Sequence, residues 1–168
     1  MGVVSTSFAF ACGACLLICM AAAYMRTGAL NLFGAASFVF VMFWVSRAVS
    51  ASLSPPWSLA HYPVQDVAML GLMWATWQKP SAVWRVAVSF LLLLQLGFHA
   101  GYWGLYVAGA TDVHALRGYI LLNNLGMAGI LLALSLQGVG HVLAGIADLR
   151  RSEPVLWAGG VDHPRHVR

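Results

Sequence analysis

Long stretches without any charged side chain constrain this chain more than any other feature. Four of them cover residues 1–25, 27–46, 86–111 and 118–147. The hydrocarbon core of a bilayer is about 30 Å thick, and a helix needs about 20 mostly apolar residues to cross it. Each stretch is long enough, so the sequence predicts four membrane-spanning helices.

A fifth segment, 59–77, is apolar in character but contains His61, Pro63 and Asp66. Proline is tolerated in the first turn of a helix, so we expect a spanning helix that begins at the membrane interface. The predicted fold is an all-α integral membrane bundle of about five transmembrane helices, forming one domain over 1–149. The predicted spans are 3–25, 28–46, 59–77, 86–109 and 119–146, and 150–168 is expected to be a basic, mostly irregular tail.

The composition supports lipid as the solvent of this chain. Hydrophobic residues make up 61% and charged residues only 8%, whereas soluble domains carry about 25% charged residues. So few charges cannot cover a water-facing surface of this size. The basic residues stand singly between apolar stretches or in the tail, which does not favour nucleic-acid binding.

The distribution of basic residues predicts an orientation. With five spans, one side holds Arg47 and Arg117. The other side holds Arg26, Lys79, Arg85, Arg150, Arg151, Arg165 and Arg168. Cytoplasmic loops are enriched in Lys and Arg. We therefore expect the N-terminus outside, the C-terminus in the cytoplasm, and insertion in a cell inner membrane.

Polar side chains at comparable depth in three predicted helices form the main candidate site. They are His61, Asp66, Gln95, His99, Asn123 and Asn124. Ionisable groups within a span are costly and usually face the bundle interior or a water-filled cavity. One interpretation is a small site opening outward, with Asp66 and His99 as a coupled acid–base pair or part of a proton or ion path. The other is a hydrogen-bonded cluster that only holds the helices together. No catalytic residue can be assigned.

Small residues recur at helical spacing in two spans. Gln95, His99, Tyr102 and Tyr106 share one face of the fourth predicted helix, next to rows of small residues. Small side chains let helix backbones approach closely in lipid. The positions predicted to mediate helix packing, within the chain or with a second copy or another membrane protein, are Gly97, Gly101, Gly104, Gly126, Ala133 and Gly140.

Cysteines and histidines raise the question of redox chemistry. Cys12, Cys15 and Cys19 share one face of the first predicted helix. A membrane thiol–disulfide exchanger usually has a second cysteine pair in an outer loop, which this sequence lacks, so packing is the preferred role. Haem would need two imidazoles at one depth on facing helices, and the histidines do not match in depth. We therefore predict no metal site and no cofactor.

The middle of the chain, from Arg47 to Trp103, resembles a known group of proteins. The residues that carry the resemblance are the run from His61 to Asp66, the pair Trp84-Arg85, and Gln95, His99 and Trp103. They are similar to small uncharacterised multi-spanning membrane proteins encoded by tailed bacteriophages and prophages. The resemblance implies a bacterial or phage origin and the bacterial inner membrane, and it implies no particular activity.

Three functional hypotheses remain open from the sequence. The leading one is a non-enzymatic membrane protein that acts through helix packing or association, as a phage-encoded or accessory protein. The second is a small channel or holin-like permeability protein that uses the polar cluster. The third is a membrane redox protein that uses the cysteines or a haem.

Overall fold

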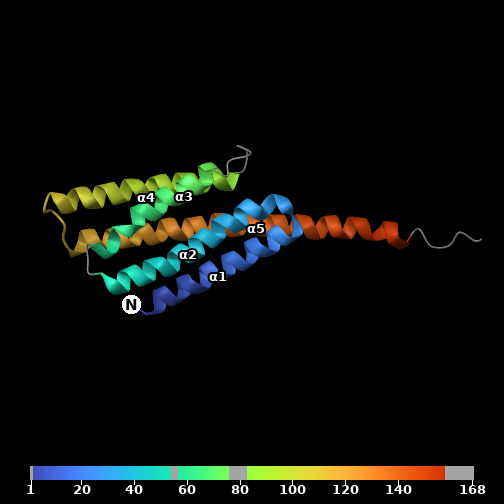
Figure 1. The fold of residues 1–168 in the computed structure, drawn as a ribbon, viewed down its shortest axis with the longest axis horizontal. Coiled ribbons are helices and arrows are strands. Elements are labelled where there is room, and N and C mark those ends of the chain that lie inside the picture. Colours follow the sequence, from blue (N-terminus) through green and yellow to red (C-terminus); the bar gives the residue numbers. More distant parts are fainter. Residues whose placement is uncertain (1, 54–56, 76–82, 158–168) are drawn as a thin grey trace, which may run out of the picture.

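The structure is a bundle of helices (Figure 1). The computed structural model describes residues 2–53, 57–75 and 83–157, and side chains within 6–151 of these ranges. Its elements are α1 (Gly2–Met25), η1 (Thr27–Ala29), α2 (Leu30–Ser52), η2 (Trp57–Leu59), α3 (His61–Ala75), α4 (Val83–Val107) and α5 (Val113–Trp157). The described residues form helices and short connections without a strand, so the predicted all-α class is confirmed.

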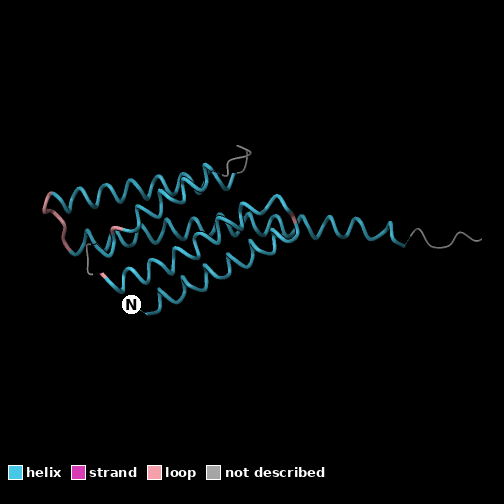
Figure 2. The backbone as a smooth tube through the Cα atoms, viewed as in Figure 1, coloured by secondary structure: helices cyan, strands magenta, loops and turns pink. Residues whose placement is uncertain are grey.

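The five α-helices run alternately in opposite directions, and α5 extends past the end of the others (Figure 2). Helix α5 is the axis of the bundle, because it packs against α1 on one side and α4 on the other. Helix α2 lies against α1 and α3, and α3 lies against α4. The N-terminus, the start of α3 and the α4–α5 connection therefore lie at one end of the bundle, which we call the N-terminal end.

Four of the helices are long and apolar enough to cross a membrane. These segments are Thr6–Met25, Thr27–Ser52, Val83–Val107 and Val113–Arg151. The described part of helix α3, His61–Ala75, has 15 residues, and positions 76–77 of the fifth predicted span lie outside the described residues. Over the described residues, the fifth predicted span is thus a helix at the expected place.

Several predicted boundaries are wrong, and local capping explains two of them. Helix α5 begins at Val113 rather than 119, because Asp112 caps it: the Ala115 amide donates to the Asp112 carboxylate at 2.7 Å. Helix α4 ends at Val107 rather than 109, because Gly109 adopts the left-handed conformation (φ 69°) typical of a helix C-terminus.

Two helices also continue further than the sequence suggested. Helix α2 runs to Ser52 instead of ending at 46, so Arg47 lies within it, above the ring of Trp44. Helix α5 runs to Trp157, so the tail is not irregular over 150–157. Residues 158–168, the rest of the predicted tail, lie outside the described residues. The charged side chains at these predicted span boundaries therefore do not end α2 or α5.

The side chains are sorted for a lipid surrounding. Large apolar side chains point outward along the spans, among them Phe90 and Leu93 on α4 and Leu132 and Leu136 on α5. Buried polar side chains lie inside instead, on α3, α4 and α5. Exposed apolar surface on this scale is unfavourable in water. The arrangement is compatible with a multi-pass membrane protein.

The contact between α1 and α5 depends on small residues. A Cβ atom added at Gly138 would lie 2.8 Å from Cγ2 of Ile18, and one at Gly145 would lie 2.9 Å from Cβ of Met25. Cys19 and Ala22 of α1 are completely buried on this side. Close backbone approach therefore holds α1 to the axis helix, as is common between helices in lipid.

We predict that Gly138→Ala destabilises the protein by about 1–3 kcal/mol, because overpacking forces Ile18 or the helices to shift. Gly140→Ala is the matched control on the same helix, since nothing lies within 4 Å of its added Cβ. Thermal unfolding of both variants in one detergent, followed by circular dichroism, measures the difference. Equal midpoints for the two variants would contradict the proposed close contact.

Candidate functional site

Three buried polar side chains from three helices form a continuous hydrogen-bonded group. The Nε2 atom of His99 lies 2.9 Å from Oδ2 of Asp66, and its Nδ1 atom lies 2.7 Å from the hydroxyl of Tyr119. Asp66, His99 and Tyr119 are only 5%, 2% and 4% exposed. This Asp66–His99–Tyr119 triad joins α3, α4 and α5 near the N-terminal end of the bundle.

Helical periodicity places each member of the triad on a buried face. Asp66 shares its face of α3 with Met69 and Met73, three and seven residues later. His99 lies one turn after Gln95 on the buried face of α4. On α5, Tyr119 lies one turn before Asn123. The polar groups thus replace apolar core residues at positions that already face the interior.

A second pair of polar side chains lies next to the triad. The amide nitrogen of Gln95 donates to the side-chain oxygen of Asn123 at 3.0 Å and to its backbone carbonyl at 3.2 Å. A Cβ at Gly126 would lie 2.6 Å from Cδ of Gln95. Glycine at this position therefore provides the space in which the Gln95 side chain lies against α5. The Oε1 atom of Gln95 is buried and accepts no hydrogen bond from the described residues.

The sequence identified four of the five residues of this cluster. Asp66, Gln95, His99 and Asn123 come together as predicted, whereas Tyr119 was missed, although it shares a face of α5 with Asn123 and Gly126. His61, the first residue of α3, lies against the ring of Tyr62 in a tilted arrangement, with centroids 4.2 Å apart. Asn124 is half-buried, and no side-chain hydrogen bond within the described chain joins it to the cluster.

Aromatic rings cover the triad on the side of the N-terminal end. Tyr102 stacks on Tyr119 with centroids 4.3 Å apart, and Tyr62 lies parallel to the imidazole of His99 at 6.5 Å. Trp103 contacts Tyr102 at 6.0 Å. We call this group the aromatic cap, and its members are Trp57, Tyr62, Tyr102, Trp103, Tyr106 and Tyr119.

An apolar layer separates the triad from the opposite end of the bundle. On the buried face of α4, Leu92 and Val88 follow Gln95 in that direction, and both are almost completely buried. They belong to the same core cluster as Met69, Met73, Ile130 and Leu134. Only beyond them comes another buried charged residue, Arg85, next to the ring of Trp84. Apolar side chains therefore separate the polar cluster from Arg85 and the opposite end of the bundle.

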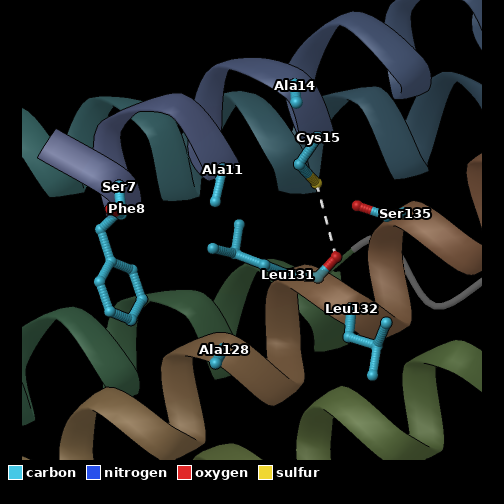
Figure 3. A pocket seen from close by; sticks show the side chains of 9 residues that line it. All are labelled: Ser7, Phe8, Ala11, Ala14, Cys15, Ala128, Leu131, Leu132 and Ser135. Atoms are coloured by element: carbon cyan, nitrogen blue, oxygen red, sulfur yellow. Dashed lines mark hydrogen bonds between the residues drawn. The ribbon is translucent and has the colours of Figure 1, made fainter. Parts of the chain in front are cut away.

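The three cysteines face α5 and are buried, with free thiols. The Sγ atom of Cys15 donates to the carbonyl of Leu131 at 3.8 Å, and that of Cys19 donates to Leu134 at 3.7 Å. Cys15 also lines an apolar pocket of about 450 Å³ between α1 and α5 (Figure 3). The other lining residues are Ser7, Phe8, Ala11, Ala14, Ala128, Leu131, Leu132 and Ser135. These contacts are those of small packing residues.

The small residues predicted to mediate packing divide into two sets. Gly126 contacts Gln95, and Ala133 packs against the buried core. The others, Gly97, Gly101, Gly104 and Gly140, have no atom within 4 Å of an added Cβ. They do not pack against another helix of the described chain, which corrects the prediction for contacts within the bundle. Their faces point outward because the buried face of α4 is occupied by Gln95, His99 and Tyr102 instead.

The geometry also bears on metal and haem binding. His99 uses both ring nitrogens in hydrogen bonds, so neither is free to bind iron in this arrangement. His141 contacts the amide of Gln137 one turn earlier, at 3.2 Å. Within the part of the chain that the structure describes, no three His, Cys, Asp or Glu side chains gather as a metal site would need.

Comparison of the chain with protein-family models, with curated proteins and with solved structures finds no match. The triad and its surroundings are therefore the features from which a function can be inferred.

We predict that His99→Leu destabilises the protein by about 3–5 kcal/mol, because it leaves a buried carboxylate without its partner. The double variant Asp66→Leu/His99→Leu is expected to recover much of this loss, since an apolar pair of similar volume replaces a buried polar pair at little cost. His114→Leu, at an exposed position of α5, is the control. Unfolding midpoints in detergent measure all three, and a strictly additive double variant would argue against the contact.

Proposed function

We propose that this chain is a non-enzymatic multi-pass protein of a bacterial inner membrane whose working part is a proton-binding site, the Asp66–His99–Tyr119 triad. One observation carries the proposal: a carboxylate, an imidazole and a phenol are buried together and joined by hydrogen bonds of 2.9 and 2.7 Å. A buried carboxylate in direct contact with an imidazole is an arrangement that is common at functional sites.

The same geometry accommodates the triad with and without an added proton. In the deprotonated state, the Nε2–H of His99 donates to the Asp66 carboxylate and the Tyr119 hydroxyl donates to Nδ1. When one proton is added, the imidazolium donates to both neighbours and the charges of Asp66 and His99 cancel. Because both states keep the same atoms hydrogen-bonded, the triad can take up and release a proton without a large rearrangement.

A second proton changes this balance. It neutralises Asp66 and leaves the imidazolium of His99 as an uncompensated buried cation, which is costly in an apolar environment. Helix α3 packs against α4 and α2, and the Asp66–His99 bond is a direct polar link between α3 and α4. Protonation would therefore weaken the attachment of α3. This connects the site to the function in helix packing that the sequence suggested.

Proton exchange at one side of the membrane fits the site better than conduction across it. The layer formed by Val88, Leu92, Met69, Met73, Ile130 and Leu134 interrupts the polar groups. A channel would need polar or water-filled surroundings along the whole path. The proposed site therefore exchanges protons with the N-terminal end of the bundle.

The basic residues favour an orientation in which this end faces outward. Among the described residues, Arg26, Arg85, Arg150 and Arg151 belong to the opposite end or its connections, whereas Arg47 and Arg117 belong to the N-terminal end. The positive-inside rule then places the C-terminus in the cytoplasm. The resemblance to phage-encoded and prophage-encoded membrane proteins supports a bacterial inner membrane.

We predict that reporters fused to the two ends of the chain report opposite compartments, with the C-terminal one in the cytoplasm. An odd number of crossings requires this, and α3 is the helix that makes the number odd. Paired alkaline-phosphatase and fluorescent-protein fusions in a bacterial host measure it. Signals from the same compartment would eliminate the five-span arrangement.

We also predict that the proton taken up by the purified protein after a pH step is bound by His99. Difference infrared spectroscopy should show the ring bands of an imidazolium, and His99→Gln should remove those bands. His114→Gln, which alters an exposed imidazole outside the triad, is the matched control. If the bands are unchanged in His99→Gln, the triad is not the proton-binding site.

Proton flux across vesicles that contain the protein distinguishes the second hypothesis. A channel would produce flux that falls in Asp66→Ala and His99→Ala. The proposal expects no flux above that of empty vesicles, because the apolar layer remains closed.

A further inference from the structure

We propose that Tyr119 is a redox-active tyrosine, which gives one electron to a lipid peroxyl radical through the aromatic cap while its proton passes to His99. The inference goes beyond proton binding but rests on the same hydrogen bonds, since it needs the triad of the proposed function. Two independent features carry it: the phenol–imidazole–carboxylate arrangement, and an uninterrupted series of ring contacts from Tyr119 to the surface of the bundle.

The first feature is a proton acceptor in the correct place. Removing an electron from a buried phenol leaves a cation radical, which is costly in an apolar environment unless the proton leaves as well. The hydroxyl of Tyr119 lies 2.7 Å from Nδ1 of His99, so the proton has to move only along an existing hydrogen bond. The Asp66 carboxylate, 2.9 Å from Nε2, then compensates the imidazolium that forms.

The charge balance favours this transfer in lipid. Before oxidation, with His99 neutral, the triad carries the single negative charge of Asp66. Afterwards it contains a neutral tyrosyl radical and an imidazolium–carboxylate pair, so its net charge is zero. The step converts an uncompensated buried charge into a compensated pair, which an apolar environment favours.

The second feature is a route for the electron. Tyr102 stacks on Tyr119 at 4.3 Å, and Trp103 lies 6.0 Å from Tyr102. From Trp103, the ring of Trp57 is 6.5 Å away and that of Tyr106 is 5.5 Å away. Trp57 is 64% and Tyr106 is 39% exposed. The series thus begins at a buried ring and ends at two exposed ones.

The location of the exposed rings indicates the oxidant. Trp57 and Tyr106 lie near helix ends, where tryptophan and tyrosine side chains contact the membrane interface. Peroxyl radicals of oxidised lipids are polar enough to reach this interface and are one-electron oxidants of phenols. The peroxyl radical takes the electron from the exposed ring and one proton from interfacial water, so that it becomes a hydroperoxide and the water becomes a hydroxide ion. Tyr119 loses its O–H bond, its electron passes through the rings, and its proton remains on His99.

The test uses the full-length protein in vesicles of polyunsaturated phosphatidylcholine, in which an azo initiator generates peroxyl radicals. Electron paramagnetic resonance of samples frozen during the reaction detects a tyrosyl radical, and ring-deuterated tyrosine identifies it by narrowing the signal. We expect the signal in the wild type and its loss in Tyr119→Phe, which keeps the stacked ring and removes only the hydroxyl. Tyr24→Phe, at a fully lipid-facing position of α1, should keep the signal.

Two further variants test the mechanism. His99→Gln should greatly reduce the radical yield because the proton acceptor is lost, and Trp103→Leu should slow the appearance of the signal because the ring series is broken. Unfolding midpoints of each variant show that the bundle is intact. A wild-type signal in Tyr119→Phe would overturn the assignment, and so would undiminished yields in both His99→Gln and Trp103→Leu.

The outcomes separate this inference from the proposed function. Absence of any tyrosyl radical in the wild type, together with pH-dependent imidazolium bands that His99→Gln removes, would overturn the redox role and leave the proton-binding site standing. Missing imidazolium bands with the radical present would reject the proposed proton exchange and support a triad that serves Tyr119.

Discussion

A buried carboxylate surrounded by apolar helices must have a partner, and the arrangement of α3, α4 and α5 follows from that requirement. Asp66 is buried on α3, and its carboxylate lies against His99 of α4. The second ring nitrogen of His99 then needs its own partner, which Tyr119 of α5 provides. One turn away, Gln95 and Asn123 repeat the same kind of contact, and Gly126 gives Gln95 the space to make it. Two adjacent polar contacts thus fix the register of α4 on α5.

The other side of the axis helix is built on a different principle. Helix α1 lies against α5 through Cys15, Cys19 and Ala22, with Gly138 and Gly145 facing it. The thiols of Cys15 and Cys19 donate to backbone carbonyls of α5. This interface is held by close packing, which in lipid takes the place of the hydrophobic effect. The helices on the two sides of α5 therefore have different roles. Helices α1 and α2 provide a packed scaffold, and α3 and α4 carry the groups that can change their protonation.

The proposed proton binding and the proposed oxidation of Tyr119 are two uses of one arrangement. Both need a basic nitrogen at the phenol and a carboxylate behind it, and both depend on the apolar surroundings that make charge expensive. The apolar layer around Val88 and Leu92 restricts exchange to one end. The aromatic cap connects the same end to the membrane interface. A cluster that only holds the helices together would need the hydrogen bonds. It would need neither the proposed proton exchange at one end nor the continuous series of rings.

The sequence by itself predicted a lipid surrounding for this protein, the number and places of its helices, and most of the polar residues of the site. The length of the charge-free stretches was sufficient to predict the helices, and Asp112 is of a residue type that often caps the first turn of a helix. Which face of each helix points inward was decided only by the tertiary structure. Helical spacing shows that Gly97, Gly101 and Gly104 lie close to one another, but a lipid surrounding tolerates small and apolar residues inside and outside alike. They turned outward because burying Gln95 and His99 fixes the rotation of α4. The partner of His99 on α5 was likewise hidden, since only the packed bundle brings Tyr119 within hydrogen-bonding distance.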